Sequence, residues 1–410
     1  MFSKLDSLCH VVGYTILSFL DISYNQLSGE LPDCWSQVQY LAILILTNNN
    51  LSGRIPSSFE SLIVIQSLHL GENNFSGELP SLKSPRLRVL DVGENKLSEP
   101  IPTWIGKNQS NLVVLILRSN KFYGSMSTSF CYLSSLQLLD LSSNNISGRI
   151  PKCLSNLTEL REYGSPYTTI NIPYLNSASP FEPRAATPFF DEAQFIWKGN
   201  PSRYKSTLGL VKNIDLSNNK LMGEIPKGIT ELTGLVSLNL SRNNLSGKIP
   251  SEMGQLIWLD ALDLSNNQIS GIIPSSLSRV DRLGVLDLSN NNLSGKIPTS
   301  TQLQSFDAAT YMGNPELCGA PLPKCQWEER DNSGANKESK EEEGQPGFIT
   351  KGFYVSAAIG FVIAFWGVCG SLLLIKSWRH AYFKLLDHVQ DWIYVMTAVN
   401  KAKLLRMIKS

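Results

Sequence analysis

Groups that could perform catalysis are sparse in this sequence, and no spacing brings them together. The chain has four histidines, His10, His69, His380 and His388, and neither a G-x-S-x-G elbow nor a phosphate-binding glycine loop accompanies them. Acid–base or nucleophilic catalysis needs such groups within hydrogen-bonding reach of one another. We therefore expect no enzyme, no cofactor and no metal site, and the remaining chemistry is recognition of another molecule.

Side chains that could recognise a partner lie where a short L-D-L-S pattern is broken. Most copies carry an aspartate that we expect to be solvated scaffold: Asp21, Asp91, Asp140, Asp215, Asp263 and Asp287. Exposed apolar groups beside a cation can anchor a peptide or a protein surface, whereas drift in units that contact nothing is the alternative. The ligand-binding candidates on the expected concave face are Ile43, Ile45, His69, Val114, Ile116 and Arg118.

A repeated unit must position these residues. The pattern L-x-L-x-x-N-x-L recurs with asparagine spacings of 24, 24, 22, 25, 24, 75, 24, 24 and 24 residues. The ten asparagines are Asn25, Asn49, Asn73, Asn95, Asn120, Asn144, Asn219, Asn243, Asn267 and Asn291. Side chains alternate along a short strand, so the two leucines point inward and the residue between them points outward. One coil cannot bury its leucines alone, and the units must stack as a solenoid.

Residue types within each unit have separate physical roles. The asparagine amide can donate to and accept from backbone groups that would otherwise be buried without partners. In the following L-S-G-x-I-P segment, as at 51–56 and 293–298, glycine permits φ > 0 and proline restricts the turn. This segment resembles the consensus of the plant-specific leucine-rich-repeat family over roughly residues 8–310. The resemblance implies an α/β repeat fold, a curved right-handed leucine-rich-repeat solenoid.

The 75-residue spacing marks an insertion, because residues 161–207 do not follow the repeat. Six prolines and nine aromatic residues occur there, which is too aromatic for a disordered linker, so we expect this island to pack against the solenoid. An island before four repeats resembles plant receptor-like proteins and some related receptor kinases. By that resemblance, Trp197 and Tyr204 belong to a K-G-x-x-x-x-Y segment and are ligand-binding candidates. A packed insertion without ligand contacts is the alternative.

Six of the seven cysteines precede residue 326 and fall into three plausible pairs, which suits an oxidising compartment. The pairs are Cys9 with Cys34, Cys131 with Cys153, and Cys318 with Cys325. Residues 311–325 resemble the family's C-terminal cap, which a disulfide would close. Eight N-x-S/T sequons predict glycosylation at Asn50, Asn74, Asn108, Asn145, Asn156, Asn239, Asn244 and Asn292. A glycan at Asn239 would cover part of the concave face.

Beyond the cap, the composition changes three times. An acidic spacer, 326–351, precedes the uncharged stretch 352–375, which is long enough to cross a bilayer as a single transmembrane helix. Lys376 and Arg379 follow at once and predict a cytosolic C-terminus. Small residues recur every four positions on one face of this helix and could contact a partner helix: Gly352, Ser356, Gly360 and Ala364.

The last 35 residues cannot hold a kinase, because a kinase needs a far longer chain with a glycine-rich loop and catalytic aspartates. Residues 376–410 hold seven Lys/Arg against two Asp/Glu, leaving 29 basic and 33 acidic residues upstream. Such a basic tail predicts contact with anionic membrane lipid. The upstream basic residues are scattered, so nucleic acid is not an expected partner.

The predicted organisation has seven parts: repeats 1–6 over 1–160, the island over 161–207, repeats 7–10 over 208–310, the cap over 311–325, the spacer over 326–351, the membrane helix over 352–375 and the tail over 376–410. The tail resembles that of receptor-like proteins of the ethylene-inducing-xylanase-receptor type. This resemblance implies a kinase-less, single-pass type I receptor of the plasma membrane that binds an extracellular peptide or microbe-derived ligand in defence. It also implies an adaptor leucine-rich-repeat receptor kinase and a co-receptor kinase as partners.

Two alternatives remain: a secreted leucine-rich-repeat inhibitor of a microbial wall-degrading enzyme, and a developmental peptide receptor. At the start of the chain, Ser7–Leu20 is fairly apolar, but His10 interrupts it and repeat register has already begun. We therefore expect no secretory signal in this stretch. A solenoid whose first leucines lack a cap should be insoluble, so we expect the sequence to be part of a longer receptor.

Overall fold

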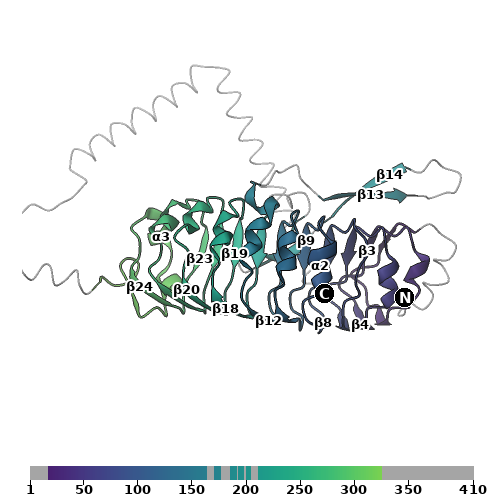
Figure 1. Ribbon diagram of the computed structural model, residues 1–410, viewed down its shortest axis with the longest axis horizontal. Coiled ribbons are helices and arrows are strands. Elements are labelled where there is room, and N and C mark those ends of the chain that lie inside the picture. The colour runs from purple at the N-terminus through teal and green to yellow at the C-terminus, as the bar shows by residue number, and fades with distance from the viewer. Residues whose placement is uncertain are drawn as a thin grey trace, which may run out of the picture. The chain divides into compact units, whose positions relative to one another are not determined.

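The structure is a computed structural model that describes residues 17–163, 170–176, 185–191, 193–197, 200–204 and 211–325. Ten coils each contribute one strand to a parallel ten-stranded sheet along the solenoid (Figure 1). Its strands are β1 (Phe19–Asp21), β3 (Ile43–Ile45), β5 (Ser67–His69), β7 (Val89–Asp91), β9 (Val114–Ile116), β11 (Leu138–Asp140), β17 (Asn213–Asp215), β19 (Ser237–Asn239), β21 (Ala261–Asp263) and β23 (Val285–Asp287). The predicted leucine-rich-repeat solenoid is therefore confirmed.

The L-S-G segments form a second layer of parallel strands. They are β2 (Ser28–Glu30), β4 (Asn50–Arg54), β6 (Asn74–Gly77) and β8 (Lys96–Leu97) in one sheet, and β10 (Tyr123–Ser125), β12 (Asn145–Gly148), β18 (Lys220–Glu224), β20 (Asn244–Lys248), β22 (Gln268–Gly271), β24 (Asn292–Lys296) and β25 (Glu316–Cys318) in the other. The layer divides after β8, where Glu99-Pro100 stands in place of Gly-x. Proline has no amide hydrogen to donate to a strand ladder, and only an isolated bridge joins Pro100 to Tyr123.

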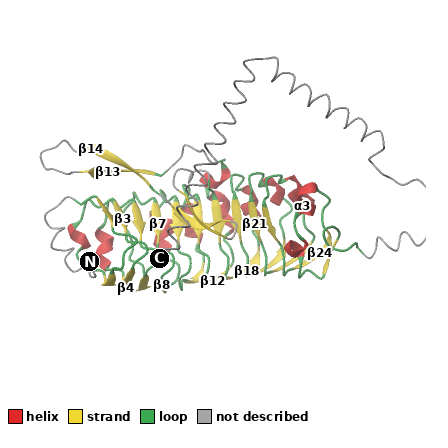
Figure 2. Ribbon diagram, turned by 180° about the vertical axis from the view of Figure 1, so that it is seen from behind, coloured by secondary structure: helices red, strands yellow, loops and turns green. Residues whose placement is uncertain are grey.

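Short helices complete the coils between the two strand layers (Figure 2). The α-helices are α2 (Thr103–Asn108) and α3 (Thr301–Ser305). The 3-10 helices are η1 (Trp35–Gln37), η2 (Ser57–Ser61), η3 (Thr128–Tyr132), η4 (Lys152–Asn156), η5 (Thr158–Arg161), η7 (Lys227–Glu231), η8 (Met253–Gln255), η9 (Ser275–Arg279) and η10 (Ala308–Tyr311). The solvent-inaccessible leucines of the strands, such as Leu44, Leu68 and Leu90, form the core with the apolar faces of these helices.

The asparagine ladder works as predicted. Asn73 accepts a hydrogen bond from the amide of Leu51 at 3.1 Å and donates to the carbonyls of Leu46 and Leu70 at 3.0 and 3.2 Å. The ladder amides from Asn49 onward each satisfy backbone groups of two successive coils, whereas Asn25, among the described residues, donates only to carbonyls of its own coil. The residue before each ladder asparagine is left-handed, with φ of 50–58° at ten non-glycine positions. Sequence reasoning missed these positions because their residue types vary from tyrosine to glutamate.

The cap contains an eleventh member of this ladder. Asn314 accepts from the amide of Leu293 at 2.9 Å and donates to the carbonyls of Leu288 and Tyr311 at 3.0 and 2.9 Å. β25 continues the second strand layer by pairing with β24. The predicted cap is thus a degenerate coil, and its place 23 residues after Asn291 was the available signal.

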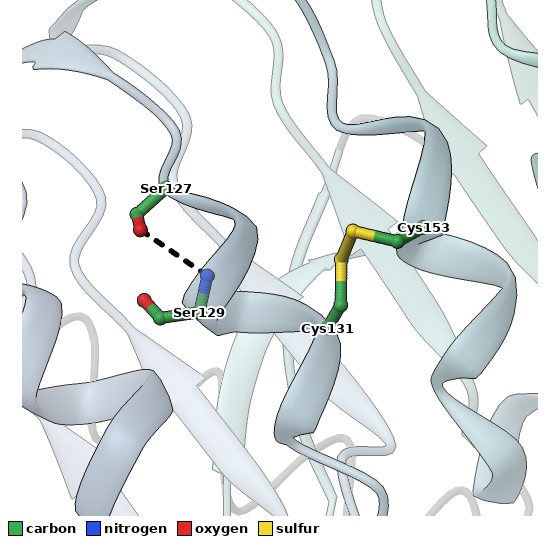
Figure 3. Close-up of a disulfide and its surroundings, with 4 residues drawn as sticks. All are labelled: Ser127, Ser129, Cys131 and Cys153. Atoms are coloured by element: carbon green, nitrogen blue, oxygen red, sulfur yellow. Dashed lines mark hydrogen bonds between the residues drawn. A yellow bond between two sulfur atoms is a disulfide. The ribbon is translucent and has the colours of Figure 1, made fainter.

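Two of the three predicted disulfides are confirmed. Cys131 in η3 bonds to Cys153 in η4 of the next coil, with Cα atoms 5.6 Å apart (Figure 3). In the same view, Ser127 Oγ accepts a hydrogen bond from the amide of Ser129 and caps η3. Cys318 bonds to Cys325 and closes the cap. Cys9 lies outside the described residues, so its pairing with Cys34 stays a prediction.

The island leaves the solenoid without interrupting the ten-stranded sheet. β11 pairs directly with β17, in the register Leu138 with Asn213 and Asp140 with Asp215. The 75-residue spacing therefore contains a single coil and a large insertion. Gly234, in the coil after the island, packs against Glu162, where the chain leaves the solenoid. A Cβ on Gly234 would overlap the Glu162 carbonyl oxygen.

A buried lysine holds the two ends of the insertion together. The Lys212 side chain is buried, and its ammonium donates to the carbonyls of Glu159 and Glu162, the latter at 2.8 Å. It also lies 3.2 Å from the Glu159 carboxylate. A buried ammonium is stable only with such partners, so Lys212 ties the seventh coil to the end of the sixth.

The predicted membrane helix begins beyond Cys325, the last described residue. No helix among the described residues is long and apolar enough to cross a bilayer. The predicted spacer, membrane helix and tail, 326–410, lie outside those residues, together with Gly352, Ser356, Gly360 and Ala364.

Lys212→Met should destabilise the junction, because it keeps the apolar stem and leaves the Glu159 and Glu162 carbonyls without their donor. We expect the free energy of unfolding to fall by roughly 2–4 kcal/mol, measured by urea unfolding. Lys227→Met is the matched control, since the exposed Lys227 ammonium pairs only at the surface with Glu252, at 2.7 Å. Equal small shifts in both variants would show that Lys212 does not hold the junction.

Candidate ligand-binding site

Part of the island lies over the first half of the ten-stranded sheet. β13 (Asn171–Asn176) and β14 (Ala185–Phe190) form an antiparallel hairpin, in which Ile172 is opposite Phe189 (Figure 1). Arg88, at the start of the fourth strand, donates to the Asn171 carbonyl at 3.0 Å. A second hairpin, β15 (Ala193–Trp197) with β16 (Asn200–Tyr204), carries Trp197 and Tyr204, whose side chains lie outside the described residues.

The first hairpin is held by an apolar cluster outside the leucine core. Ile170 and Ile172 are buried against outward-facing residues of four strands. The strand partners are Ile43, Val89, Val114, Ile116 and Leu138. Phe19 stacks on Tyr174 with ring centroids 4.9 Å apart and lies 5.5 Å from Phe189. The expectation that the island packs against the solenoid is confirmed for this hairpin.

This packing corrects the expectation that the apolar candidates are exposed. Ile43, Val114 and Ile116 are each 0% exposed, and Ile45 is half-buried at the edge of the same cluster. Outward-facing apolar residues on a strand need a cover, but their spacing does not identify it. Here the cover is the chain's own island. In the sequence, Ile170 follows Ile43, Val114 and Ile116 by more than 50 residues.

A buried charged cluster joins the hairpin end to the sheet. His69 Nε2 lies 2.9 Å from Asp191 Oδ1, and His69 Nδ1 lies 3.8 Å from Asp91. Burial by itself lowers the pKa of His69, but the charges and hydrogen bonds of Asp191 and Asp91 outweigh it and raise this pKa from 6.5 to about 10. The ring is therefore a cation at neutral pH, and it binds the island to the third coil.

Arg118 extends the cluster along the sheet. It pairs with Glu94 at 3.0 Å and lies 3.7 Å from Asp140. Burial raises the pKa of Asp140, although the Arg118 charge opposes the shift. Burial and the neighbouring Asp140 charge raise the pKa of Asp215 to about 7. The prediction of solvated scaffold is wrong for these two aspartates, which are 1% and 3% exposed.

A cavity of about 160 Å³ opens where the hairpin ends. Phe189, Phe190 and Asp191 line it from the island side, and the first five coils supply the opposite wall. Three of the six strand candidates meet there: Ile45, His69 and Arg118. Sequence reasoning missed Phe190 and Asp191 as site residues, because no spacing relates an insertion to distant strands; His69, for example, is 122 residues from Asp191.

The predicted glycosylation sites differ in access. Six of the asparagines are exposed and Asn74 is half-buried; the exposed ones are Asn50, Asn108, Asn145, Asn156, Asn244 and Asn292. Asn239 is half-buried, its Nδ2 donates to Asp215 at 3.3 Å, and its Oδ1 accepts from the Ser241 hydroxyl at 2.7 Å. Both the nitrogen and the oxygen of this side-chain amide are thus hydrogen-bonded within the protein.

Glycopeptide mass spectrometry should find glycans at Asn244 and Asn292 and none at Asn239. A glycan on the Asn239 nitrogen would disturb the hydrogen bond to the buried Asp215 carboxylate. Asn244 is a close control, because it belongs to the same coil and is exposed. High glycan occupancy at Asn239 would contradict this prediction and would mean that a glycan covers part of the concave sheet face.

His69→Gln should loosen the hairpin in a pH-dependent manner. Because the pKa of His69 is raised in the folded protein, the stabilisation is complete below about pH 6.5 and is lost as the pH rises through about 10. Hydrogen exchange of β13 and β14 amides, compared with wild type at each pH, should show the largest loss of protection near pH 6. A difference independent of pH would exclude the charged pair as the cause.

Comparisons with known proteins agree with this architecture. Leucine rich repeat family models match residues 17–38, 40–62, 86–108, 110–162, 211–232, 234–256, 258–280 and 282–303. The chain is 54% identical over 387 residues to Receptor-like protein EIX2 of tomato, Solanum lycopersicum. That alignment covers 94% of this chain and 38% of the relative, so the chain spans less than half of the relative's length.

Solved structures give the same fold with different roles. The Arabidopsis receptor kinase HAESA, in complex with the peptide hormone IDA and the co-receptor SERK1, matches with a TM-score of 0.58 at 31% identity, over 76% of this chain and 43% of that one. A plant ice-binding protein matches with a TM-score of 0.55 at 28% identity, over 75% and 83%. The solenoid, the island and the similarity to EIX2 together place the chain: it belongs to the leucine-rich-repeat family and, within it, to the plant receptor-like proteins.

Proposed function

We propose that this chain is the membrane-proximal part of a cell-surface receptor-like protein that binds an extracellular peptide or microbe-derived molecule and has no kinase of its own. The similarity to EIX2 over 94% of the chain supports a receptor-like protein. The observation that carries ligand binding is the cavity between the island and the sheet, where Ile45, His69 and Arg118 meet Phe189 and Phe190. Trp197 and Tyr204 remain further candidates on the second hairpin.

The chemistry of this cavity supports a binding role. Its cations are held in ion pairs by neighbouring carboxylates, which fix the orientation of the side chains around it. The ice-binding protein with the same solenoid shows that this fold alone does not determine the partner, so the site must carry the assignment.

In this proposal, signalling depends on partner proteins. We propose a type I topology in the plasma membrane, with 352–375 as the membrane helix and the basic tail against anionic lipid. The small-residue face of this helix would bind an adaptor leucine-rich-repeat receptor kinase. HAESA is solved with a peptide and with SERK1, which supports recruitment of a co-receptor kinase by a related solenoid. We also propose that the receptor acts in defence.

Gly360→Leu should weaken co-precipitation of the adaptor kinase at least several-fold, because a bulky side chain prevents close approach of two membrane helices. The control is Val362→Leu, two residues further on, which lies on a different helix face. Undiminished kinase recovery with Gly360→Leu would refute the helix contact. Equal recovery of the receptor itself in all samples establishes that expression is not the cause.

Membrane fractionation separates this proposal from its main rival. A receptor with a membrane helix should sediment with plasma-membrane markers and resist carbonate extraction. A secreted inhibitor of a microbial wall-degrading enzyme should appear in the soluble extracellular fraction. A developmental peptide receptor would also sediment, and is distinguished from a defence receptor by whether microbial extracts or endogenous peptides trigger kinase recruitment.

A further inference from the structure

The cavity beside the hairpin is too small for a whole ligand. Its volume of about 160 Å³ is below the roughly 300–1,000 Å³ of pockets that enclose drug-sized molecules. It lies at one end of the hairpin and is lined by Phe189 of the island and Ile45 of the sheet. A space of this size suits one side chain of a larger ligand whose remaining contacts lie elsewhere.

Two glycines keep the cavity floor open. Gly71 and Gly93 occupy the position after the second core residue of the strand pattern, where other coils have Thr47, Arg118 or serine. A Cβ at Gly71 would lie 3.1 Å from the Asp91 carboxylate, and a Cβ at Gly93 would lie 3.1 Å from Ile116. The bare backbone therefore exposes the Asp91 carboxylate and the aliphatic stem of Arg118 to the cavity.

The charges that line the cavity do not balance. Four acidic residues face two cations, and the acids are Asp21, Glu72, Asp91 and Asp191. Both cations are already engaged: His69 lies 2.9 Å from Asp191, and Arg118 lies 3.0 Å from Glu94. Asp140, which is outside the lining, further compensates Arg118 at 3.7 Å. The field remaining in the cavity is therefore negative, and it is strongest near the exposed Asp21 and the half-buried Glu72.

Aromatic rings stand at the open side of this negative space. Phe190 is 44% exposed and Tyr24 is 52% exposed, and both line the cavity. Aromatic rings are enriched where proteins bind one another. The face of such a ring also attracts a cation within about 6 Å. The cavity lining thus offers apolar contacts to the aliphatic part of a ligand side chain and carboxylates to a positively charged group at its end.

We infer that this cavity binds a single cationic side chain, arginine or lysine, of the extracellular peptide or protein ligand. The inference deepens the proposed function and depends on it. The alkyl stem contacts Ile45 and Phe189, and the charged end lies toward Asp21, Glu72 and Asp91. The paired His69 and Arg118 hold the wall in place and do not contribute an anion-binding charge.

The test uses the full chain in detergent micelles and Nα-acetyl-arginine amide as the probe. Its neutral isostere, Nα-acetyl-citrulline amide, has nearly the same shape without the charge, and Nα-acetyl-glutamate amide has the opposite charge. Saturation-transfer NMR titrations give a Kd for each probe. We expect the arginine probe to bind at least about fivefold more tightly than citrulline, with the difference decreasing as salt rises.

Variants of the rim locate the binding. Asp21→Asn should raise the Kd of the arginine probe about two- to fivefold, the range for an exposed ion pair, and the double variant with Glu72→Gln about tenfold. Asp263→Asn is the matched control. Asp21 and Asp263 occupy the same strand slot, and each accepts from the amide and hydroxyl of the serine two residues later at 3.0 and 2.7 Å. The control should not change the Kd.

Equal binding of arginine and citrulline, tighter binding of the glutamate probe, or equal effects of Asp21→Asn and Asp263→Asn would overturn the inference. None of these outcomes affects the proposed receptor function, which is tested separately by kinase recruitment and membrane fractionation. Conversely, loss of kinase recruitment would leave the cation preference of the cavity intact. The two proposals therefore fail in distinguishable ways.

Discussion

The direct pairing of β11 with β17 is the constraint on which the remaining structure depends. Because the sheet continues across the insertion, the island cannot contribute a coil to the leucine core. Its apolar residues must find another surface, and the outward side of the same sheet is the nearest one. Lys212 and Gly234 are consequences of this arrangement, since the chain must leave and re-enter the solenoid at one place, through a buried ammonium and a close backbone contact.

The outward side of the sheet is divided accordingly. The first strand position is Ile43, Val89, Val114 or Leu138 in four of the first six coils, and Asn213 or Ser237 in the two coils after the island. Apolar residues on the first group are buried by Ile170 and Ile172, which is the main contribution to hairpin docking. Asn213 and Ser237 are also buried, at 1% and 6% exposure, but they lie outside this apolar cluster. The difference between apolar and polar first positions is visible in the repeat sequences, but only the island explains it.

Sequence spacing was sufficient for features that repeat locally. The solenoid, the asparagine hydrogen bonds and two disulfides follow from contacts between successive coils, about 24 residues apart. The site was only half predictable. Ile45, His69 and Arg118 stood out as departures from the repeat, but the His69 partner Asp191 is 122 residues away in an irregular segment. No periodicity reports such a contact, and an apolar strand position looks the same whether an island or a ligand covers it.

The charged pairs under the island contribute more to selecting one position of the hairpin than to the free energy of folding. Burying His69 and Arg118 costs desolvation that their carboxylate partners only partly return, and apolar replacements could pack equally well. Apolar packing alone, however, would tolerate several positions of a hairpin that lies across parallel strands. A bond from Asp191 to His69 admits one position, with Phe189 over Phe19 and the cavity open beside it. The ion pairs thus determine where the hairpin ends, and with it the shape and charge of the cavity.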